Sequence, residues 1–69
     1  MTIFAKRLKE RRIHQGVTSQ EMADALGLKL RAYQYYESAE REPNIAKLVI
    51  IADMLHTSID YLTGRIDHP

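Results

Sequence analysis

Two side chains suited to hydrogen bonding with base edges, Arg31 and Gln34, stand three positions apart in segment 29–37. Residues three or four apart share one face of a helix, so Leu30 and Tyr35 would project to the same side. Arginine carries a planar fork of donors that matches guanine O6 and N7, and glutamine can pair with N6 and N7 of adenine. A good bidentate pair discriminates between bases by about 1 to 3 kcal/mol. The alternative is that all four form an ordinary solvated face.

Four tyrosines in so short a chain raise the prospect of stacking on single-stranded nucleic acid. Tyr33 and Tyr36, however, follow helical spacing on the opposite, apolar face of the same segment, and Tyr61 lies in a later apolar stretch. Core packing is therefore preferred for these three. Of the four tyrosines, only Tyr35 is expected to face away from the core. There it could contact a thymine methyl group or hydrogen-bond a phosphate through its hydroxyl.

Residues capable of catalysis or metal binding form no recognisable constellation. His14, His56 and His68 lie in separate segments, without a carboxylate or second ligand at metal-binding spacing. Cysteine is absent, which excludes disulfides and thiolate ligands within this chain, and the glycines stand singly rather than in a phosphate-binding loop. We therefore expect no enzyme, no metal site and no cofactor.

The 69 residues are enough for one small domain, expected to span residues 1–69, and the formal net charge is only +1. The distribution of basic residues is therefore more informative than their sum. Five of them cluster in one segment: Lys6, Arg7, Lys9, Arg11 and Arg12. No long apolar run or signal-peptide pattern is present, so we expect no membrane contact and a cytoplasmic location.

Hydrophobic spacing and capping residues predict about five helices and no strand, hence an all-α fold. The helices are expected to begin near Ile3, Thr18, Lys29, Asn44 and Ser58. Thr18 and Glu21 form a capping box, Gly16 ends the first helix, and residues 65–69 are expected to be a loose tail. The positions expected to face the core include Phe4, Leu8, Ile13, Ile45, Leu48, Val49, Ala52 and Leu55.

Residues 18–37 predict two short helices joined through Gly27, with the small Ala23 where the helices cross. The contact positions of such a pair carry Met22, Leu26, Leu28, Tyr33 and Tyr36. This stretch resembles the helix-turn-helix of Cro and the lambda-type phage repressors, the XRE family. The resemblance covers about residues 4–64, because the segments 7–12, 16–18, 41–44, 51–55 and 58–62 are also similar to that family. It implies a compact five-helix domain of the lambda-repressor type.

In that family the second helix of the motif enters the major groove of DNA and the first crosses the backbone. The resemblance implies the following base-reading residues: Leu30, Arg31, Gln34 and Tyr35. Contacts to the DNA backbone position a protein without specifying a base. The candidates for these contacts are Thr18, Ser19, Gln20, Lys29, Arg12 and Arg41. The resemblance also implies a structural ion pair between Arg12 and Glu37, and we expect it to be partly buried.

The chain departs from the family pattern beside the reading helix. Ser19 stands where many members have a glutamine, although Gln20 follows it, and Lys29 stands where serine or threonine often caps the third helix. A lysine there suits a nearby phosphate, or it is a plain exposed side chain. Arg41 lies in an acidic loop and either binds a phosphate or pairs with an acid. The acids within reach are Glu37, Glu40 and Glu42.

A single helix-turn-helix covers few base pairs, so we expect a homodimer that occupies a palindromic operator on double-stranded DNA, with half-sites about 34 Å apart. Candidate dimer contacts are Ile59, Leu62 and Ile66. Core closure is the alternative, preferred for Leu62 and left open for the other two. The predicted function is a DNA-binding transcriptional regulator, a repressor of phage or mobile-element type.

The runner-up is a protein-interaction module, an antirepressor or adaptor with the same fold. In that hypothesis Leu30, Tyr33 and Tyr35 contact a regulatory protein partner instead of DNA. The low net charge, the acidic loop and Ser19 favour it. A positive, concave face around Arg31 would indicate DNA, whereas a flat apolar patch around Leu30 and Tyr35 would indicate a protein.

Overall fold

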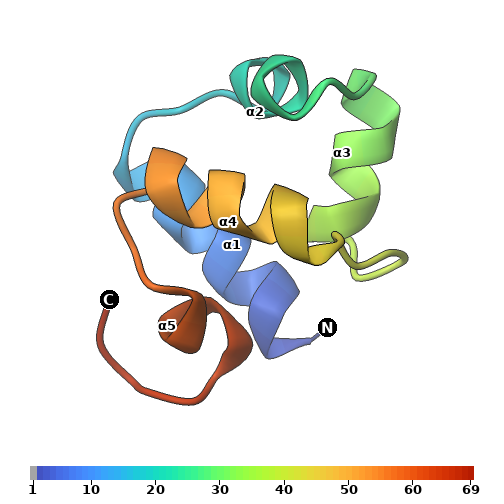
Figure 1. Ribbon diagram of the computed structural model, residues 1–69. Coiled ribbons are helices and arrows are strands. Elements are labelled where there is room, and N and C mark those ends of the chain that lie inside the picture. The colour runs from blue at the N-terminus through green and yellow to red at the C-terminus, as the bar shows by residue number, and fades with distance from the viewer. Residues whose placement is uncertain (1) are drawn as a thin grey trace.

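The computed structural model describes residues 2–69, which form five helices and no strand (Figure 1). The helices are α1 (Ile3–His14), α2 (Ser19–Leu26), α3 (Leu30–Glu37), α4 (Ile45–Met54) and α5 (Ile59–Thr63). This confirms the predicted all-α class. The longest helix has 12 residues, and no helix in the described range is long and apolar enough to cross a lipid bilayer.

Four helices begin at a side chain that accepts a backbone hydrogen bond. The capping residues are Thr2 for α1, Thr18 for α2, Asn44 for α4 and Ser58 for α5. At α2 the capping box is complete, because Glu21 Oε1 also accepts from the Thr18 amide at 2.9 Å. Lys29 offers no acceptor, so α3 begins without a side-chain cap.

A residue in the left-handed backbone region follows every helix. Glycine takes this position after α1, α2 and α5, as Gly16, Gly27 and Gly64. After α3 it is Ala39 with a φ of 67°, and after α4 it is His56 with a φ of 50°. This conformation costs an L residue roughly 1 to 2 kcal/mol, so two of the five helix ends carry backbone strain.

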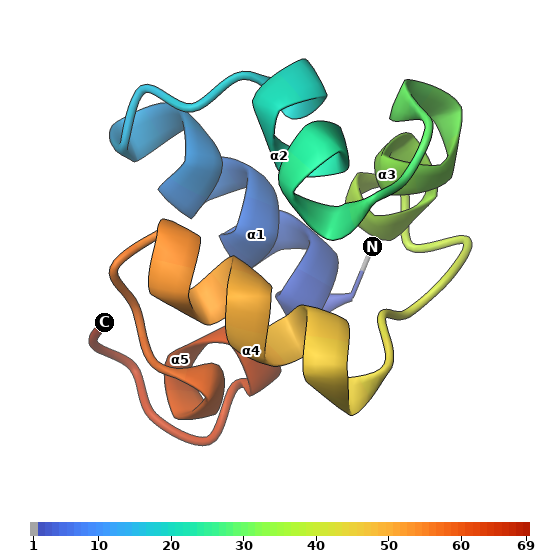
Figure 2. The same ribbon diagram turned by 45° about the horizontal axis from the view of Figure 1, so that its top comes forward.

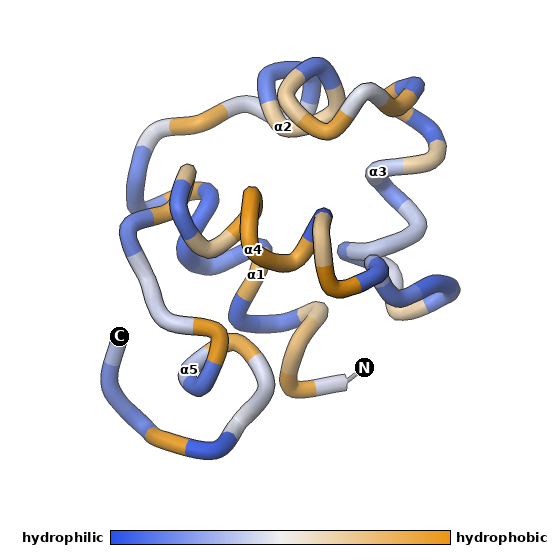
Figure 3. Tube along the Cα trace, viewed as in Figure 1, coloured by the Kyte–Doolittle hydropathy of each residue, from blue (hydrophilic) through white to orange (hydrophobic). Residues whose placement is uncertain are grey.

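The helices pack around one apolar core. Helix α2 contacts α3, α1 contacts α3 and α5, and α4 contacts α2 and α5. Figure 2 shows α2 and α3 together at the top of the molecule, with α4 and α5 below them. The buried apolar side chains are Ala5, Leu8, Met22, Ala23, Leu26, Tyr33, Tyr36, Ile51, Ala52, Leu55 and Leu62. Figure 3 shows α4 as largely hydrophobic and α3 as pale to hydrophilic along its trace.

Three residues expected to face the core are exposed instead. Ile13, Ile45 and Val49 keep 60%, 80% and 42% of their surface accessible. On α4, Ile45 and the buried Ala52 are seven residues apart and lie on nearly the same side of the helix, so position around the helix does not explain the exposure of Ile45. Ile13 lies five residues after the buried Leu8, roughly 140° further around α1. Apolar spacing therefore predicted the wrong burial for these three positions, because burial also depends on which part of a helix the other elements cover.

Some residues of the segment expected to be a loose tail make hydrogen bonds to the domain. The amide of Arg65 donates to the Asp60 carbonyl at 2.8 Å. Arg7 Nη1 donates to the Ile66 carbonyl at 2.7 Å, and Arg7 Nη2 lies 3.3 Å from Asp67 Oδ1. Ile66 is 59 positions from Arg7 in the chain, so the local sequence pattern could not predict this contact.

Candidate nucleic-acid interface

Helix α3 has one buried face and one exposed face. Tyr33 has no accessible surface and Tyr36 keeps 7%, and their rings pack edge to face with centroids 6.2 Å apart. The opposite face presents Arg31 and Gln34 to solvent, and Tyr35 is half-buried beside them. Packing against α1 and α2 therefore fixes which side of α3 can meet a partner.

The exposed face of α3 borders a shallow hollow of about 290 Å³. Its lining consists of Arg31, Gln34, Tyr35, Ser38 and Glu40. Three of the four predicted base-reading residues thus meet at one concavity, whereas the half-buried Leu30 does not line it. Sequence reasoning missed Glu40 as part of this surface. Its carboxylate accepts a hydrogen bond from Ser38 Oγ at 2.8 Å.

Tyr35 contacts an arginine on each side. Arg31 Nε donates a hydrogen bond to the Tyr35 hydroxyl at 3.2 Å. The guanidinium carbon of Arg41 lies 4.6 Å from the centroid of the same ring, within cation–π range. Among the ion pairs of residues 2–69, none joins Arg41 to a neighbouring acid. The ring of Tyr35, and not a carboxylate, is therefore the partner of Arg41.

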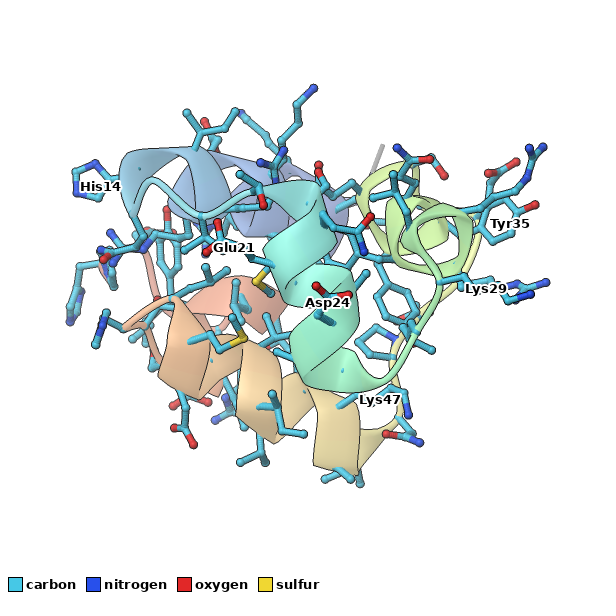
Figure 4. All side chains as sticks on the ribbon, turned by 90° about the horizontal axis from the view of Figure 1, so that it is seen from above. His14, Glu21, Asp24, Lys29, Tyr35 and Lys47 are labelled. Carbon is cyan, nitrogen blue, oxygen red and sulfur yellow. The ribbon has the colours of Figure 1, made fainter. Side chains whose placement is uncertain are left out.

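The remaining candidates for backbone contact lie at the start of α2 and α3. Figure 4 shows Lys29 and Tyr35 projecting from the same side of the molecule. Thr18 is exposed, and its hydroxyl, while capping α2, keeps its own hydrogen for donation. Ser19 is half-buried. Gln20 Nε2 donates a hydrogen bond to Asp24 Oδ1 at 2.9 Å, so one of its two amide hydrogens is already used inside the protein.

Arg12 and Glu37 form the ion pair that the sequence predicts, and it is partly buried. Arg12 Nε and Nη2 donate to the two carboxylate oxygens at 2.6 and 3.2 Å, and each side chain keeps 14% of its surface exposed. Arg12 Nη1 donates to the Val17 carbonyl at 3.0 Å, and the Tyr33 hydroxyl also donates to Glu37. Hydrogen bonding to Glu37 raises the pKa of Arg12, and burial raises the pKa of Tyr33.

This network engages Arg12 inside the protein. All three guanidinium nitrogens are hydrogen-bonded inside the protein, and the side chain is largely covered. Its role is to tie α1 and the turn before α2 to the end of α3. The structure thus shows a structural role for Arg12, and the phosphate contact considered for it stays a prediction.

A family model described as Helix-turn-helix matches residues 8–62, which include the α2–α3 pair. The chain belongs to the helix-turn-helix family. The match begins within α1 and ends within α5, which agrees with the resemblance found in the sequence.

Relatives of this helix-turn-helix protein carry regulator names. The cryptic phage CTXphi transcriptional repressor RstR of Vibrio cholerae is 44% identical in an alignment of length 63 that covers 86% of this chain and 56% of RstR. The HTH-type transcriptional regulator YqaE of Bacillus subtilis is 42% identical over 60 residues, 87% of this chain and 52% of YqaE. The chain spans about half the length of these curated relatives.

A solved structure is also similar. The crystal structure of a transcriptional regulator from Listeria innocua matches with a TM-score of 0.82 and 33% sequence identity. The match covers 96% of this chain and 62% of the Listeria chain. The five-helix arrangement of this helix-turn-helix protein is thus found in a known regulator.

The arginines of the basic cluster in α1 form hydrogen bonds inside the helix-turn-helix domain. Arg7 Nη1 donates to the Tyr61 carbonyl at 2.6 Å and its guanidinium lies 4.2 Å from the Tyr61 ring centroid. Arg11 Nη2 donates to the carbonyls of Leu55 and His56 at 3.0 and 3.2 Å, at the end of α4. Sequence reasoning missed both roles. The one available signal was that Arg7 and Arg11 are four residues apart and share a helix face.

The three predicted dimer contacts of the helix-turn-helix protein differ in accessibility. Leu62 has no exposed surface, so it belongs to the core and cannot touch a second copy. This is the core closure that the sequence favoured for Leu62. Ile59 and Ile66 are half-buried. Large exposed apolar side chains lie elsewhere: Ile3, Ile13, Ile45, Val49 and Ile50.

Proposed function

We propose that this chain is a sequence-specific, double-stranded-DNA-binding transcriptional repressor of phage or mobile-element type. The observation that carries the proposal is the concave polar face of α3, in which Arg31 and Gln34 line one hollow beside Tyr35. Lys29 directly precedes α3 and Arg41 lies in the loop after it, and both add positive charge to this part of the chain. The name of RstR, a phage transcriptional repressor, supports the same direction.

In this proposal α3 lies in the major groove, which is wide enough to admit one helix. Arg31 pairs with guanine and Gln34 with adenine, while Leu30 and Tyr35 complete the reading face. Thr18, Ser19, Gln20, Lys29 and Arg41 contact phosphates on either side. Each phosphate neutralised adds about 0.9 to the slope of log affinity against log salt concentration.

Two copies would bind together, because one α3 contacts too few base pairs for a useful operator. A homodimer with twofold symmetry reads a palindrome whose half-sites are about 34 Å apart. Occupying such an operator in the bacterial cytoplasm would block RNA polymerase. Ile59 and Ile66 remain the proposed dimer contacts of the original set, since both retain accessible surface.

The competing function, an antirepressor or adaptor that binds a protein, fits the surface less well. It calls for a flat apolar patch around Leu30 and Tyr35. The observed face is hollow, and its lining includes the polar ends of Arg31, Gln34, Ser38 and Glu40. Hydrogen-bonding groups in a concavity suit base edges better than an apolar partner surface.

The test is selection of random duplex DNA by the purified protein, followed by titration of the enriched sequence with wild type and Arg31→Ala. We expect a palindrome, and a loss of discrimination of about 1 to 3 kcal/mol at one base pair per half-site in the variant. Arg65→Ala is the matched control, because Arg65 is exposed and lies two residues after α5, a helix that Figure 1 shows away from α3. Absence of any enriched sequence would exclude operator binding and direct the search to a protein partner.

A further inference from the structure

We propose that Tyr35 is a positioning residue that presents two arginines to DNA as one unit, Arg31 to a base edge and Arg41 to the phosphate of an adjoining nucleotide. The inference rests on the proposed DNA-binding function and assigns Tyr35 a task different from direct contact with a thymine methyl group. Its basis is that both guanidinium groups touch the same aromatic side chain.

The contact with Arg31 leaves the useful part of that arginine free. Tyr35 accepts a hydrogen bond from Nε, at 3.2 Å. The two Nη groups, which form the outer fork, remain available for guanine O6 and N7. Arg31 is exposed, so without the tyrosine hydroxyl its side chain would sample many rotamers. Fixing Nε selects the rotamers that direct the fork along the face of α3.

The contact between Tyr35 and Arg41 also leaves N–H donors of the arginine free. Its guanidinium carbon lies 4.6 Å from the ring centroid of Tyr35, so the ring holds the cation by its face. The N–H groups of a guanidinium point outward in its own plane, and stacking does not consume them. Arg41 can therefore donate to a phosphate while it is held. In residues 2–69 no ion pair with an acid competes for it.

A third feature limits where the pair can act. Glu40 lines the hollow with Arg31 and Tyr35, and Ser38 holds its carboxylate at 2.8 Å. A phosphate is repelled from this carboxylate, so the DNA backbone must approach from the side of Arg41 instead of entering the hollow. The base edge then meets Arg31 inside the hollow and the phosphate meets Arg41 outside it.

The experiment compares Tyr35→Phe with Tyr35→Leu on the selected operator, at several salt concentrations. Tyr35→Phe removes the hydroxyl and keeps the ring, so we expect discrimination at the base pair read by Arg31 to fall about three- to tenfold with an unchanged salt slope. Tyr35→Leu removes the ring as well. We expect a further two- to fivefold loss of affinity, and a salt slope shifted towards that of Arg41→Ala, which should be lower by about 0.9.

A double-mutant cycle separates positioning from direct contact. If Tyr35 acts through Arg31, Tyr35→Phe changes discrimination in the wild-type background and has no effect in the Arg31→Ala background. Tyr61→Phe is the matched control, because it removes a tyrosine hydroxyl on α5, away from α3. Thermal unfolding of each variant verifies that the domain is folded.

The possible outcomes are distinct. Additive effects of Tyr35→Phe and Arg31→Ala, or a Tyr35→Phe variant with wild-type discrimination, would overturn the inference while leaving the proposed repressor function intact. So would an operator in which uracil in place of thymine weakens the wild type and not Tyr35→Leu, because that result means a direct methyl contact. A wild-type protein that selects no DNA would overturn both proposals.

Discussion

Arg12 and Glu37 hold opposite charges where each side chain keeps only 14% of its surface exposed. Their hydrogen bonds reach Val17 and Tyr33 as well, so the pair closes a network between α1, the turn before α2, and α3. Because both groups are partly removed from water, each charge needs the other to offset its lost hydration. The loss of one leaves the other desolvated, which is far more costly than losing an exposed pair.

We therefore expect Glu37→Ala to destabilise the protein by about 3 kcal/mol, because Arg12 keeps its charge and loses its main partner. Urea unfolding at neutral pH measures this loss. The double variant Arg12→Met with Glu37→Leu should recover part of it, since apolar side chains of similar size leave no unpaired charge. A loss below about 1 kcal/mol in Glu37→Ala would mean that the pair behaves as a surface salt bridge.

Ala39 is the second residue whose environment predicts a measurable effect. It has a φ of 67° at the end of α3, where glycine is the usual choice. We expect Ala39→Gly to raise the free energy of unfolding by about 1 kcal/mol, because it removes left-handed strain. Gly27→Ala should have the opposite sign. A Cβ at Gly27 meets no atom within 4 Å, so its cost is purely conformational. Equal stability of Ala39→Gly and wild type would argue against the strain.

At the scale of elements, the start of α2 depends on a charge. The Thr18 amide donates to Glu21 Oε1 at 2.9 Å, and this hydrogen bond lowers the pKa of Glu21. Since α2 carries the residues that flank α3, its first turn matters for the interface as well as for stability. Helix α3 has no equivalent cap, so its first turn relies on packing from Tyr33 and from α2.

The lowered pKa of Glu21 predicts a pH dependence. A carboxyl group whose folded pKa lies below its unfolded pKa stabilises the fold at high pH. That contribution is complete above the unfolded pKa of about 4.3 and is lost as pH falls through the folded pKa. We expect the thermal midpoint of wild type to fall more between pH 5 and pH 3 than that of Glu21→Gln. Parallel curves would show that the carboxylate does not support α2.

For the whole molecule, the distribution of charge matters more than the net charge of +1. Arg7, Arg11 and Arg12 all point at carbonyl or carboxylate groups of the domain, so α1 contributes little of its basic cluster to an outer surface. On the proposed DNA-binding side, Lys29, Arg31 and Arg41 form no ion pair with a carboxylate of residues 2–69.

This distribution predicts a modest salt dependence of operator binding. With few cations per protomer able to reach phosphates, we expect log affinity to fall with log salt concentration with a slope of about 2 to 3 per protomer. Lys29→Ala should lower the slope by about 0.9. Lys9→Ala, an equal change of charge on the exposed part of α1, should leave it unchanged. A slope that responds equally to both variants would place DNA on a different face.

The sequence by itself determined the local features of this protein. Side-chain oxygen at Thr18, Asn44 and Ser58 predicted three helix starts, because capping is an interaction within four residues. Helical periodicity likewise placed Tyr33 and Tyr36 inside and Arg31 and Gln34 outside. The family resemblance supplied the Arg12–Glu37 pair. Each of these relations follows from spacing along one helix or from a motif whose residues are visible in the chain.

Only the tertiary structure decided which residues are covered by other elements. Leu62 is buried while Ile45 keeps 80% of its surface exposed, although both are apolar and lie on helices. Arg7 and Arg11 donate hydrogen bonds to backbone carbonyls 54 and 44 positions away in the chain. Arg41 lies over the ring of Tyr35 instead of beside an acid. Periodicity fixes the direction of a side chain around its own helix, but burial and pairing depend on what the fold places opposite it.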